Sequence, residues 1–476
     1  MKLYNSLSHE KEDFIPHEPG KVKMYTCGPT VYHFAHIGNL RSYIMEDVLE
    51  KYLRYAGYDV TRAMNITDVG HLTSDADTGE DKMLKGAKRE KKTVMEIARF
   101  YTDAFFADCD KLNVKRPDIV VPATDCIGDF IKMIEDLLEK DYAYISGGNV
   151  YFDTSKLEKY YVFNNFEAED LEVGVREGVE EDTSKRNKTD FVLWFTKSKF
   201  DDQELKWDSP WGVGYPGWHI ECSAISVNHL GEYLDIHCGG IDNAFPHHTN
   251  EIAQSEAYLG HPWCNYWFHI LHLNTSSGKM SKSKGEFLTV SLLEVKGYAP
   301  IVYRFFCLQS HYRKSLVFSW EGLDNAVTAY DKLIARIAAL DPADTSAADS
   351  EATNALRASF REAMDNDLNT SLGVTALYDV LKAAISDGAK LALLDEFDAV
   401  LGLNLLAAAE KKRAEAETAA PKADGALTEK IESMIAERAA AKKAKDYARA
   451  DEIRAELTAM GVTLKDTPTG TEYTIG

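Results

Sequence analysis

Residues 22–66 constrain the fold of this chain most, because a strand, a glycine turn, a helix and a second strand follow one another within them. Residues 22–27 form a short apolar run that ends at Gly28-Pro29-Thr30, and over residues 36–57 apolar side chains recur at helical spacing. Residues 59–66 again have the pattern of a strand. This order opens a βαβ unit, so we predict an α/β fold built on a parallel sheet.

The α/β pattern is interrupted in the middle of the chain. A hairpin is predicted over residues 143–152, with its turn at Gly147-Gly148, and an acidic run over residues 167–182 follows it. A strand, a glycine turn and a helix over residues 233–259 then restore the α/β pattern. We therefore predict that an insertion splits the sheet.

The last third of the chain has a different character. After about residue 324 it becomes helical and rich in alanine, which predicts a helical bundle up to residue 406. Residues 407–425 are rich in Ala, Glu and Lys and have no large apolar side chain, so they predict a linker. The end of the chain predicts helices over 431–440 and 446–460 and a hairpin that pairs 462–464 with 473–475.

A chain of 476 residues is too long for one ordinary core, and these patterns divide it. In chain order the predicted parts are the first half of a Rossmann-type domain (1–114), a connective insertion (115–216), the second half of the Rossmann-type domain (217–275), a lysine-rich loop and stem-contact region (276–324), a helical bundle (325–406), a linker (407–426) and a small α+β C-terminal domain (427–476).

Charge and cysteine content limit the classes of function. The formal net charge of -22 argues against indiscriminate binding of nucleic acid, which depends on Lys and Arg, so a nucleic-acid partner needs a local basic surface. No apolar run approaches the roughly 20 residues that cross a bilayer, and no signal peptide is evident. An odd number of cysteines, seven, predicts free thiols or metal ligands in a reducing compartment, and hence a cytoplasmic protein.

Two short segments, far apart in the chain, have the residues that bind phosphates. His36-Ile37-Gly38-Asn39 stands at the start of a predicted helix, where unpaired amides favour phosphate oxygens. Lys279-Met280-Ser281-Lys282-Ser283 offers lysines and hydroxyls beside Gly278, as expected of a loop that closes over a triphosphate. Each segment alone is compatible with an ordinary helix start or a solvated basic loop. Together they predict an ATP site.

A second group of residues has the chemistry of a metal site. Cys27 ends the first strand and Cys222 follows the insertion, while His247 and Glu251 lie four residues apart on one helical face. Two thiolates, an imidazole and a carboxylate suit tetrahedral zinc. Cys238 and His248 are possible rival ligands, and the alternative is that the cysteines are small core residues and His247 is an ordinary helix residue.

With these elements in order, the chain resembles the cysteinyl-tRNA synthetases of class I over nearly its whole length. The likeness rests on the segments CGPTVY from Cys27, HIGN from His36, NITD from Asn65, DFVLW from Asp190, GWHIECSA from Gly217, FPHHTNEIAQSEA from Phe245, the KMSKS loop and the C-terminal region from Gly461.

The resemblance implies an activity and its cofactors. Cysteine is expected to react with magnesium-bound ATP to give cysteinyl-adenylate and pyrophosphate, after which the cysteine tRNA accepts the cysteinyl group. Zinc, one ion per chain, would bind the substrate thiolate and so separate cysteine from serine without editing.

The resemblance also implies a role for each matched residue. Cys27, Cys222, His247 and Glu251 match the zinc ligands; Cys27, Gly28 and Trp218 match the amino-acid pocket; His36, Gly38, Asn39, Gly240, Asp242 and Lys282 match the ATP contacts; and His36, Asn39, Lys279 and Lys282 match the catalytic groups. The C-terminal domain would read the anticodon, and a basic cluster there could meet the RNA: Arg438, Lys442, Lys443, Lys445, Arg449 and Arg454.

Some positions depart from the family pattern. Asn39 replaces the last histidine of the HIGH motif, which its amide can imitate as a donor. His33 stands where aspartate is more usual and Cys238 where a small residue is expected, and either could alter the pocket near the metal. After Asp68 the usual acidic run is missing.

Two other functions compete with charging of tRNA. A related ligase that joins cysteine to an amino sugar would use the same zinc and adenylate chemistry, but it has no use for an anticodon domain. An inactive paralogue that only binds nucleotide or RNA would be expected to lose a motif, whereas this chain keeps the KMSKS lysines, the metal set and Asp242. A monomer is the expectation for the family.

Overall fold

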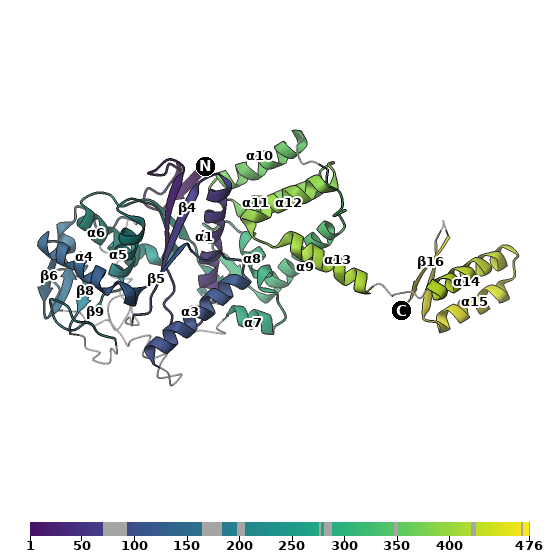
Figure 1. Cartoon of the computed structure of the whole chain (residues 1–476), viewed down its shortest axis with the longest axis horizontal. Coiled ribbons are helices and arrows are strands. Elements are labelled where there is room, and N and C mark those ends of the chain that lie inside the picture. The colour runs from purple at the N-terminus through teal and green to yellow at the C-terminus, as the bar shows by residue number, and fades with distance from the viewer. Residues whose placement is uncertain are drawn as a thin grey trace. The chain divides into compact units, whose positions relative to one another are not determined.

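The computed structural model describes residues 1–69, 93–163, 183–197, 205–275, 278–279, 288–346, 351–419, 425–467 and 470–475. They form two compact units, Met1–Leu406 and Ala407–Gly476 (Figure 1). The predicted acidic run over 167–182 and residues 280–287 of the KMSKS loop lie outside the described residues. None of the helices that the structure describes is long and apolar enough to span a membrane.

A five-stranded parallel sheet forms the centre of the larger unit, with the strand order β11-β10-β3-β4-β5. Its strands are β3 (Lys21–Thr26), β4 (Asp59–Ile66), β5 (Ile119–Pro122), β10 (Leu234–Gly240) and β11 (Cys264–Ile270). The predicted α/β class is confirmed. From β3 the chain adds β4 and β5 on one side and later β10 and β11 on the other, so the strand order reverses between β3 and β10. Ligands of open parallel sheets bind at the carboxyl ends of the strands at such a point.

Helices cover both faces of this sheet, which explains why its strands are apolar along most of their length. Helix α1 (Ile37–Tyr55), predicted over 36–57, packs on one face, and α5 (His219–Leu230) and α6 (Thr249–Leu259) lie on the other (Figure 1). The helix predicted after the glycine turn begins with a short π-helical turn, Ala244–His248, before α6. Helix α3 (Val94–Lys111) begins with a capping box between Thr93 and Glu96.

The insertion contains a four-stranded antiparallel sheet, β6-β7-β8-β9. The strands are β6 (Ala143–Ser146), β7 (Asn149–Phe152), β8 (Phe191–Phe195) and β9 (Tyr215–Pro216), and α4 (Ile127–Glu139) precedes them. The predicted hairpin is confirmed, with Ile145 opposite Val150. The range predicted for the insertion, 115–216, also contains β5, although β5 belongs to the parallel sheet.

The rest of the larger unit frames the sheet. The hairpin β1 (Lys2–Asn5) and β2 (Glu10–Asp13) opens the chain, and β12 (Leu273–Thr275), β13 (Gly278–Lys279) and β14 (Leu316–Phe318) form a small sheet. The helices that follow are α7 (Val290–Val295), α8 (Pro300–Leu308), α9 (Trp320–Ala338), α10 (Glu351–Asp365), α11 (Thr370–Lys382), α12 (Asp387–Leu401) and α13 (Leu405–Ala419). Helix α13 runs through most of the predicted linker, because Ala, Glu and Lys are strong helix formers.

The smaller unit has the predicted order of elements. It contains α14 (Gly425–Lys443), α15 (Tyr447–Ala459), β15 (Val462–Thr467) and β16 (Gly470–Ile475). The predicted hairpin is confirmed, with Val462 opposite Ile475 and Leu464 opposite Tyr473. The boundaries of the seven predicted segments remain predictions.

Candidate functional site

A cavity opens where the strand order of the parallel sheet reverses. Its wall includes Cys27 and Gly28 after β3, the segment from His36 to Asn39 at the start of α1, Gly240 at the end of β10, Trp218 before α5, and Asp242. The predicted phosphate, adenine and metal elements therefore meet at the carboxyl edge of one sheet. The cavity also borders Leu271, His272 and Leu273, which follow β11.

His36 has a structural role that the sequence analysis did not predict. It is the N-cap of α1, and its Nδ1 accepts a hydrogen bond from the Asn39 backbone N–H at 3.1 Å. Because Nδ1 is the acceptor, the neutral ring carries its proton on Nε2. The cap thus orients a ring N–H donor at a helix N-terminus, where the dipole favours an anion.

Both ends of the KMSKS loop are held near the start of α1. Before the loop, Lys279 in β13 pairs with Asn274 in β12, and the next strand residue, Leu273, lies beside Gly38. After the loop, the Leu288 carbonyl accepts the Ile37 N–H at 2.9 Å. Of the predicted loop residues, only the backbone of Lys279 is described, and Lys282 lies outside the described residues. The structure therefore brings the ends of the two predicted ATP segments together.

A chain of buried hydrogen bonds holds the turn after β3. Asn65 accepts the Gly28 N–H at 2.7 Å and donates to Thr67 at 3.0 Å, and the Thr67 hydroxyl donates to Glu221 at 2.8 Å. A side chain at Gly28 would collide with the Asn65 carbonyl oxygen, since a Cβ there would lie 1.6 Å from it. Gly28 is therefore required by close backbone approach, and Asn65, Thr67 and Glu221 position the cavity wall.

The four predicted metal ligands converge at one side of the cavity. Their donor atoms all lie within 4.8 Å of one another. The Cys27 and Cys222 sulfurs are 3.7 Å apart, Cys222 Sγ is 3.5 Å from His247 Nε2, and His247 Nε2 is 3.0 Å from Glu251 Oε1. The strand end, the helix after the insertion and the helix after β10 supply these groups, which explains their wide separation in the sequence.

A second group shares two of these residues. Cys27, His237, His248 and Glu251 also have donor atoms within 4.8 Å of one another, so His248 is a rival ligand, as the sequence analysis allowed. His237 was missed, since it lies inside the apolar strand β10 and only the fold brings its Nε2 within 2.7 Å of Glu251 Oε2. Neither group, among the residues that the structure describes, includes Cys238 or His33.

The donor groups shift one another's pKa values. Burial on its own would raise the pKa of Glu251, but His237 and His247 outweigh it and lower that pKa to about 2. Burial opposes the charge on His247, yet Glu251 and Cys222 raise its pKa to about 10. Burial raises the pKa of the Cys27 thiol well above its ordinary value. Glu251 is thus ionised in a buried pocket, where its charge is balanced by the neighbouring histidines, and a bound cation could take their place as its partner.

The remaining predicted residues lie around the same cavity. Trp218 packs on His247 with ring centroids 4.6 Å apart, so the indole forms a wall beside the predicted metal ligands. Asp242 Oδ1 lies 2.9 Å from His272 Nε2, a partner that the sequence analysis missed, although a histidine after a parallel strand is a usable signal. The nearest atom to a Cβ built on Gly240 is Ser42 Oγ at 3.8 Å, which leaves open space in front of this glycine.

Glu46, on the cavity side of α1, is a buried carboxyl group without an obvious function. It is 1% exposed, and its Oε2 has no hydrogen-bond partner within the described part of the chain. Burial raises its pKa to about 8, against the opposing charge of Arg62. The side chain is therefore largely neutral at pH 7.

The raised pKa of Glu46 makes the free energy of unfolding depend on pH. Since the pKa rises from 4.5 to about 8 on folding, its contribution to stability is fully present below pH 4.5 and is lost as the pH rises to 8. The loss is on the order of 5 kcal/mol. We expect the Glu46→Gln protein to melt at a clearly higher temperature than the unchanged protein at pH 9 and at a similar temperature at pH 5. Equal melting temperatures at pH 9 would contradict this account.

The fold and the cavity define a class I aminoacyl-tRNA synthetase. Residues 13–328 match the model of the class I tRNA synthetase (C) catalytic domain, and residues 359–406 match the DALR domain. The structure of Mycobacterium tuberculosis methionyl-tRNA synthetase in complex with methionyl-adenylate aligns with a TM-score of 0.52 at 15% identity, over 82% of this chain and 90% of that one. At that identity the likeness concerns the fold alone.

The particular family follows from closer relatives. The cysteine-tRNA ligase of Treponema denticola is 46% identical over 98% of both chains, and that of Borreliella burgdorferi is 43% identical over the full length of both. Residues 424–473 match the cysteinyl-tRNA ligase anticodon binding domain. The chain belongs to the cysteinyl-tRNA synthetase family, as the sequence motifs indicated.

Proposed function

We propose that this chain attaches cysteine to the cysteine tRNA in two steps. The carboxylate of cysteine attacks the α-phosphate of magnesium-bound ATP, the bond to the β-phosphate breaks and pyrophosphate leaves. A hydroxyl of the terminal ribose of the tRNA then attacks the carbonyl carbon of cysteinyl-adenylate and releases AMP. The observation that carries this proposal is the convergence of four metal-binding donors on a cavity that also holds the start of α1.

The residues of this chain mainly position the reactants and balance charge. The Nε2–H of His36 and the amides at the start of α1 would donate to the phosphates, with Asn39 beside them and Lys279 and Lys282 arriving from the KMSKS loop. Asp242 and the open space at Gly240 suit the ribose and the adenine. Hence no protein nucleophile is required.

The four predicted ligands fit zinc. Tetrahedral zinc with bonds of about 2.3 Å to sulfur places two sulfurs about 3.8 Å apart, and the Cys27 and Cys222 sulfurs are 3.7 Å apart. The second group is less regular, because His248 Nε2 is 3.3 Å from Cys27 Sγ but 4.0 Å from Glu251 Oε1. We infer that Cys27, Cys222, His247 and Glu251 hold the ion. Zinc, when bound, would prefer the thiolate of cysteine to the hydroxyl of serine.

Exchange of labelled pyrophosphate into ATP tests the first step. We expect exchange that depends on cysteine and is far weaker with serine. If no exchange occurs at saturating cysteine, both enzyme hypotheses are wrong, and the remaining hypothesis is an inactive paralogue that binds only nucleotide or RNA. Transfer of labelled cysteine to tRNA, compared with transfer to an amino sugar, then decides between the synthetase and the small-molecule ligase.

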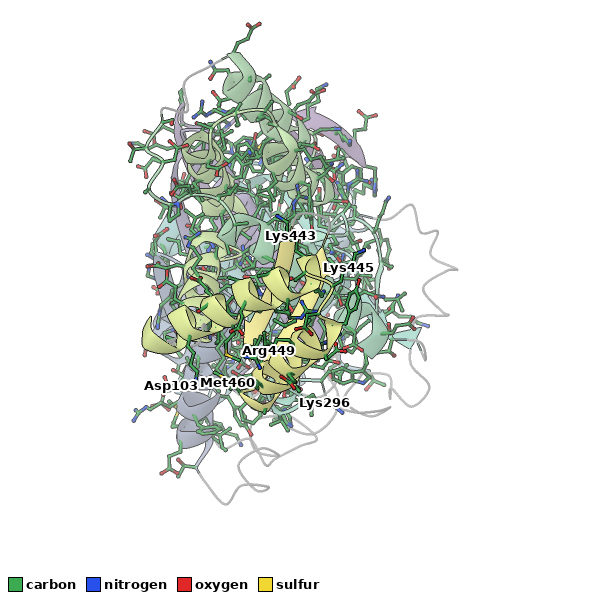
Figure 2. All side chains as sticks on the ribbon, turned by 90° about the vertical axis from the view of Figure 1, so that its right-hand side faces the viewer. Asp103, Lys296, Lys443, Lys445, Arg449 and Met460 are labelled. Carbon is green, nitrogen blue, oxygen red and sulfur yellow. The ribbon has the colours of Figure 1, made fainter. Side chains whose placement is uncertain are left out.

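The C-terminal unit favours tRNA as the acceptor. Of its predicted basic cluster, Lys442, Lys443, Lys445 and Arg454 are exposed. The predicted surface is smaller than expected, because Arg438 is 3% exposed and Arg449 forms ion pairs with Glu437, Glu452 and Glu456. Figure 2 shows Lys443, Lys445 and Arg449 on this unit. We infer that the exposed lysines, and not Arg449, supply the charge that meets the anticodon arm.

A cytoplasmic location and a monomeric state complete the proposal. All seven cysteines are free and buried, as expected of a chain kept in a reducing compartment. The described residues that we expect to bind the metal, the nucleotide and the amino acid all belong to one chain and lie around one cavity. A second copy is therefore not needed to complete the site.

A further inference from the structure

Four aromatic rings cluster beside the cavity, where the loop before α1 meets α3. His33 and Phe34 come from the loop, and Phe100 and Tyr101 come from the helix. The Tyr101 ring is parallel to His33, at 6.0 Å and 6°, and it meets Phe34 edge to face at 5.1 Å. Phe100 in turn contacts Phe34 at 6.0 Å and Tyr101 at 5.0 Å. Such contacts fix the orientation of each ring.

This cluster continues from the cavity to the molecular surface. His33, Phe34 and Tyr101 line the cavity, whereas Phe100 is 43% exposed. Tyr101, at 4% exposed, anchors the other rings from below. Phe100 does not line the cavity itself, but its ring contacts Phe34, which does, so the apolar surface is continuous from the cavity wall to Phe100.

Neither cysteine nor ATP is proposed to contact this aromatic cluster. The amino-acid side of the cavity is formed by Trp218 and the metal ligands, and the nucleotide side by Gly240 and Asp242. The second step, however, requires the terminal ribose of the tRNA inside the cavity. The unpaired base of that same nucleotide must then lie close to the adenylate. Unpaired bases bind proteins by stacking on aromatic side chains, and the π-face of any base suffices.

We propose that Phe34 and Phe100, held in place by Tyr101 and His33, form the stacking surface for the unpaired 3′-terminal base of the tRNA. This inference rests on the proposed function. Phe34 and Phe100 meet at 72° beside the cavity, so their rings do not share a plane. A base that stacks on one ring meets the other ring edge to face, and this contact places the ribose without reading the base. Phe34 and Phe100 are thus positioning residues for the transfer step.

A Phe100→Leu substitution tests the proposal, because leucine keeps an apolar side chain and removes the ring. We expect single-turnover transfer from preformed cysteinyl-adenylate to tRNA to slow by about fivefold or more. Cysteine-dependent pyrophosphate exchange should stay within about twofold of the unchanged protein, and Phe100→Tyr should restore transfer. Equal slowing of exchange and transfer would show a structural role and overturn the proposal.

A tRNA with an abasic 3′-terminal nucleotide provides a second measurement. It should slow transfer by the unchanged protein by about fivefold or more, but slow the Phe100→Leu protein much less, because the stacking partner is already lost. An equal loss in both proteins would place the base elsewhere and overturn the proposal. Circular dichroism of Phe100→Leu distinguishes misfolding from either result.

Tyr233→Leu is a matched control. Tyr233 is 46% exposed and precedes β10, at the end of the sheet opposite the cavity, where its ring stacks on His261. It should leave transfer unchanged. Absence of cysteine-dependent exchange in the unchanged protein would refute the proposed function, whereas normal exchange with unaltered transfer in Phe100→Leu would refute only the stacking surface.

Discussion

The Cys27→Ser protein should lose its bound metal and most of its ability to activate cysteine, while the parallel sheet stays folded. Serine has nearly the same shape as cysteine, and the backbone of residue 27 keeps its bonds to Cys238 and Tyr43. A hydroxyl is a far poorer zinc ligand than a thiolate. We expect metal affinity to fall by roughly 100-fold or more, and kcat/KM for cysteine in pyrophosphate exchange by roughly a thousandfold.

Metal analysis by mass spectrometry and cysteine-dependent exchange check this result. Cys238→Ala is the matched control, since Cys238 is buried on the neighbouring strand and belongs to neither donor group of the described residues. It should keep the metal and the exchange rate. Full exchange by a metal-free Cys27→Ser protein would refute the role of zinc in cysteine activation.

The two overlapping donor groups make different predictions for other substitutions. His247→Ala should remove the metal if Cys222 and His247 hold it, and His248→Gln should leave it in place. The opposite outcome would assign the ion to His237 and His248. Cysteine is expected to bind more weakly whenever the metal is lost, so equilibrium binding of cysteine should follow metal content across these variants.

The parts of this site that could be predicted from the sequence are those in which the residues lie on one helix or in one local strand-turn-helix pattern. Residues four apart on a helix share a face, so His247 and Glu251 could be paired without a structure. The strand, turn and helix at residues 22–57 likewise placed the phosphate segment at the start of α1. Cys27 and Cys222 lie on different elements and were grouped with this pair only because two thiolates complete a zinc ligand set, and the resemblance to the family then matched all four residues.

What could not be predicted depends on contacts between elements. His237 lies in an apolar strand, and no local pattern shows that its ring meets Glu251. The same holds for Asn65, whose side chain supports Gly28 across the turn after β3. Strand β5 has only four residues, the last of which is Pro122, and this is too short for a periodic signal, so its place at the sheet edge was missed.

The structure describes one residue on each side of residues 280–287 of the KMSKS loop, Lys279 before them and Leu288 after them. Lys279 is paired in β13, and the Leu288 carbonyl accepts the Ile37 N–H. Both of these described residues lie near the helix start that is predicted to bind the phosphates. The predicted metal and amino-acid residues come from other elements, since Cys27 follows β3, Cys222 lies in α5 and Glu251 lies in α6.

Lys282→Ala should therefore slow adenylate formation much more than it weakens cysteine binding. Loss of one preorganised donor to the leaving phosphates costs roughly 100- to 1,000-fold in rate, and single-turnover formation of cysteinyl-adenylate measures it. Cysteine affinity at equilibrium should change by less than about threefold, because the substitution removes a contact to the phosphates and none to cysteine. Lys284→Ala removes the same charge outside the motif and should have a much smaller effect. If cysteine affinity collapses while the rate persists, Lys282 acts on the amino-acid pocket and not on the phosphates.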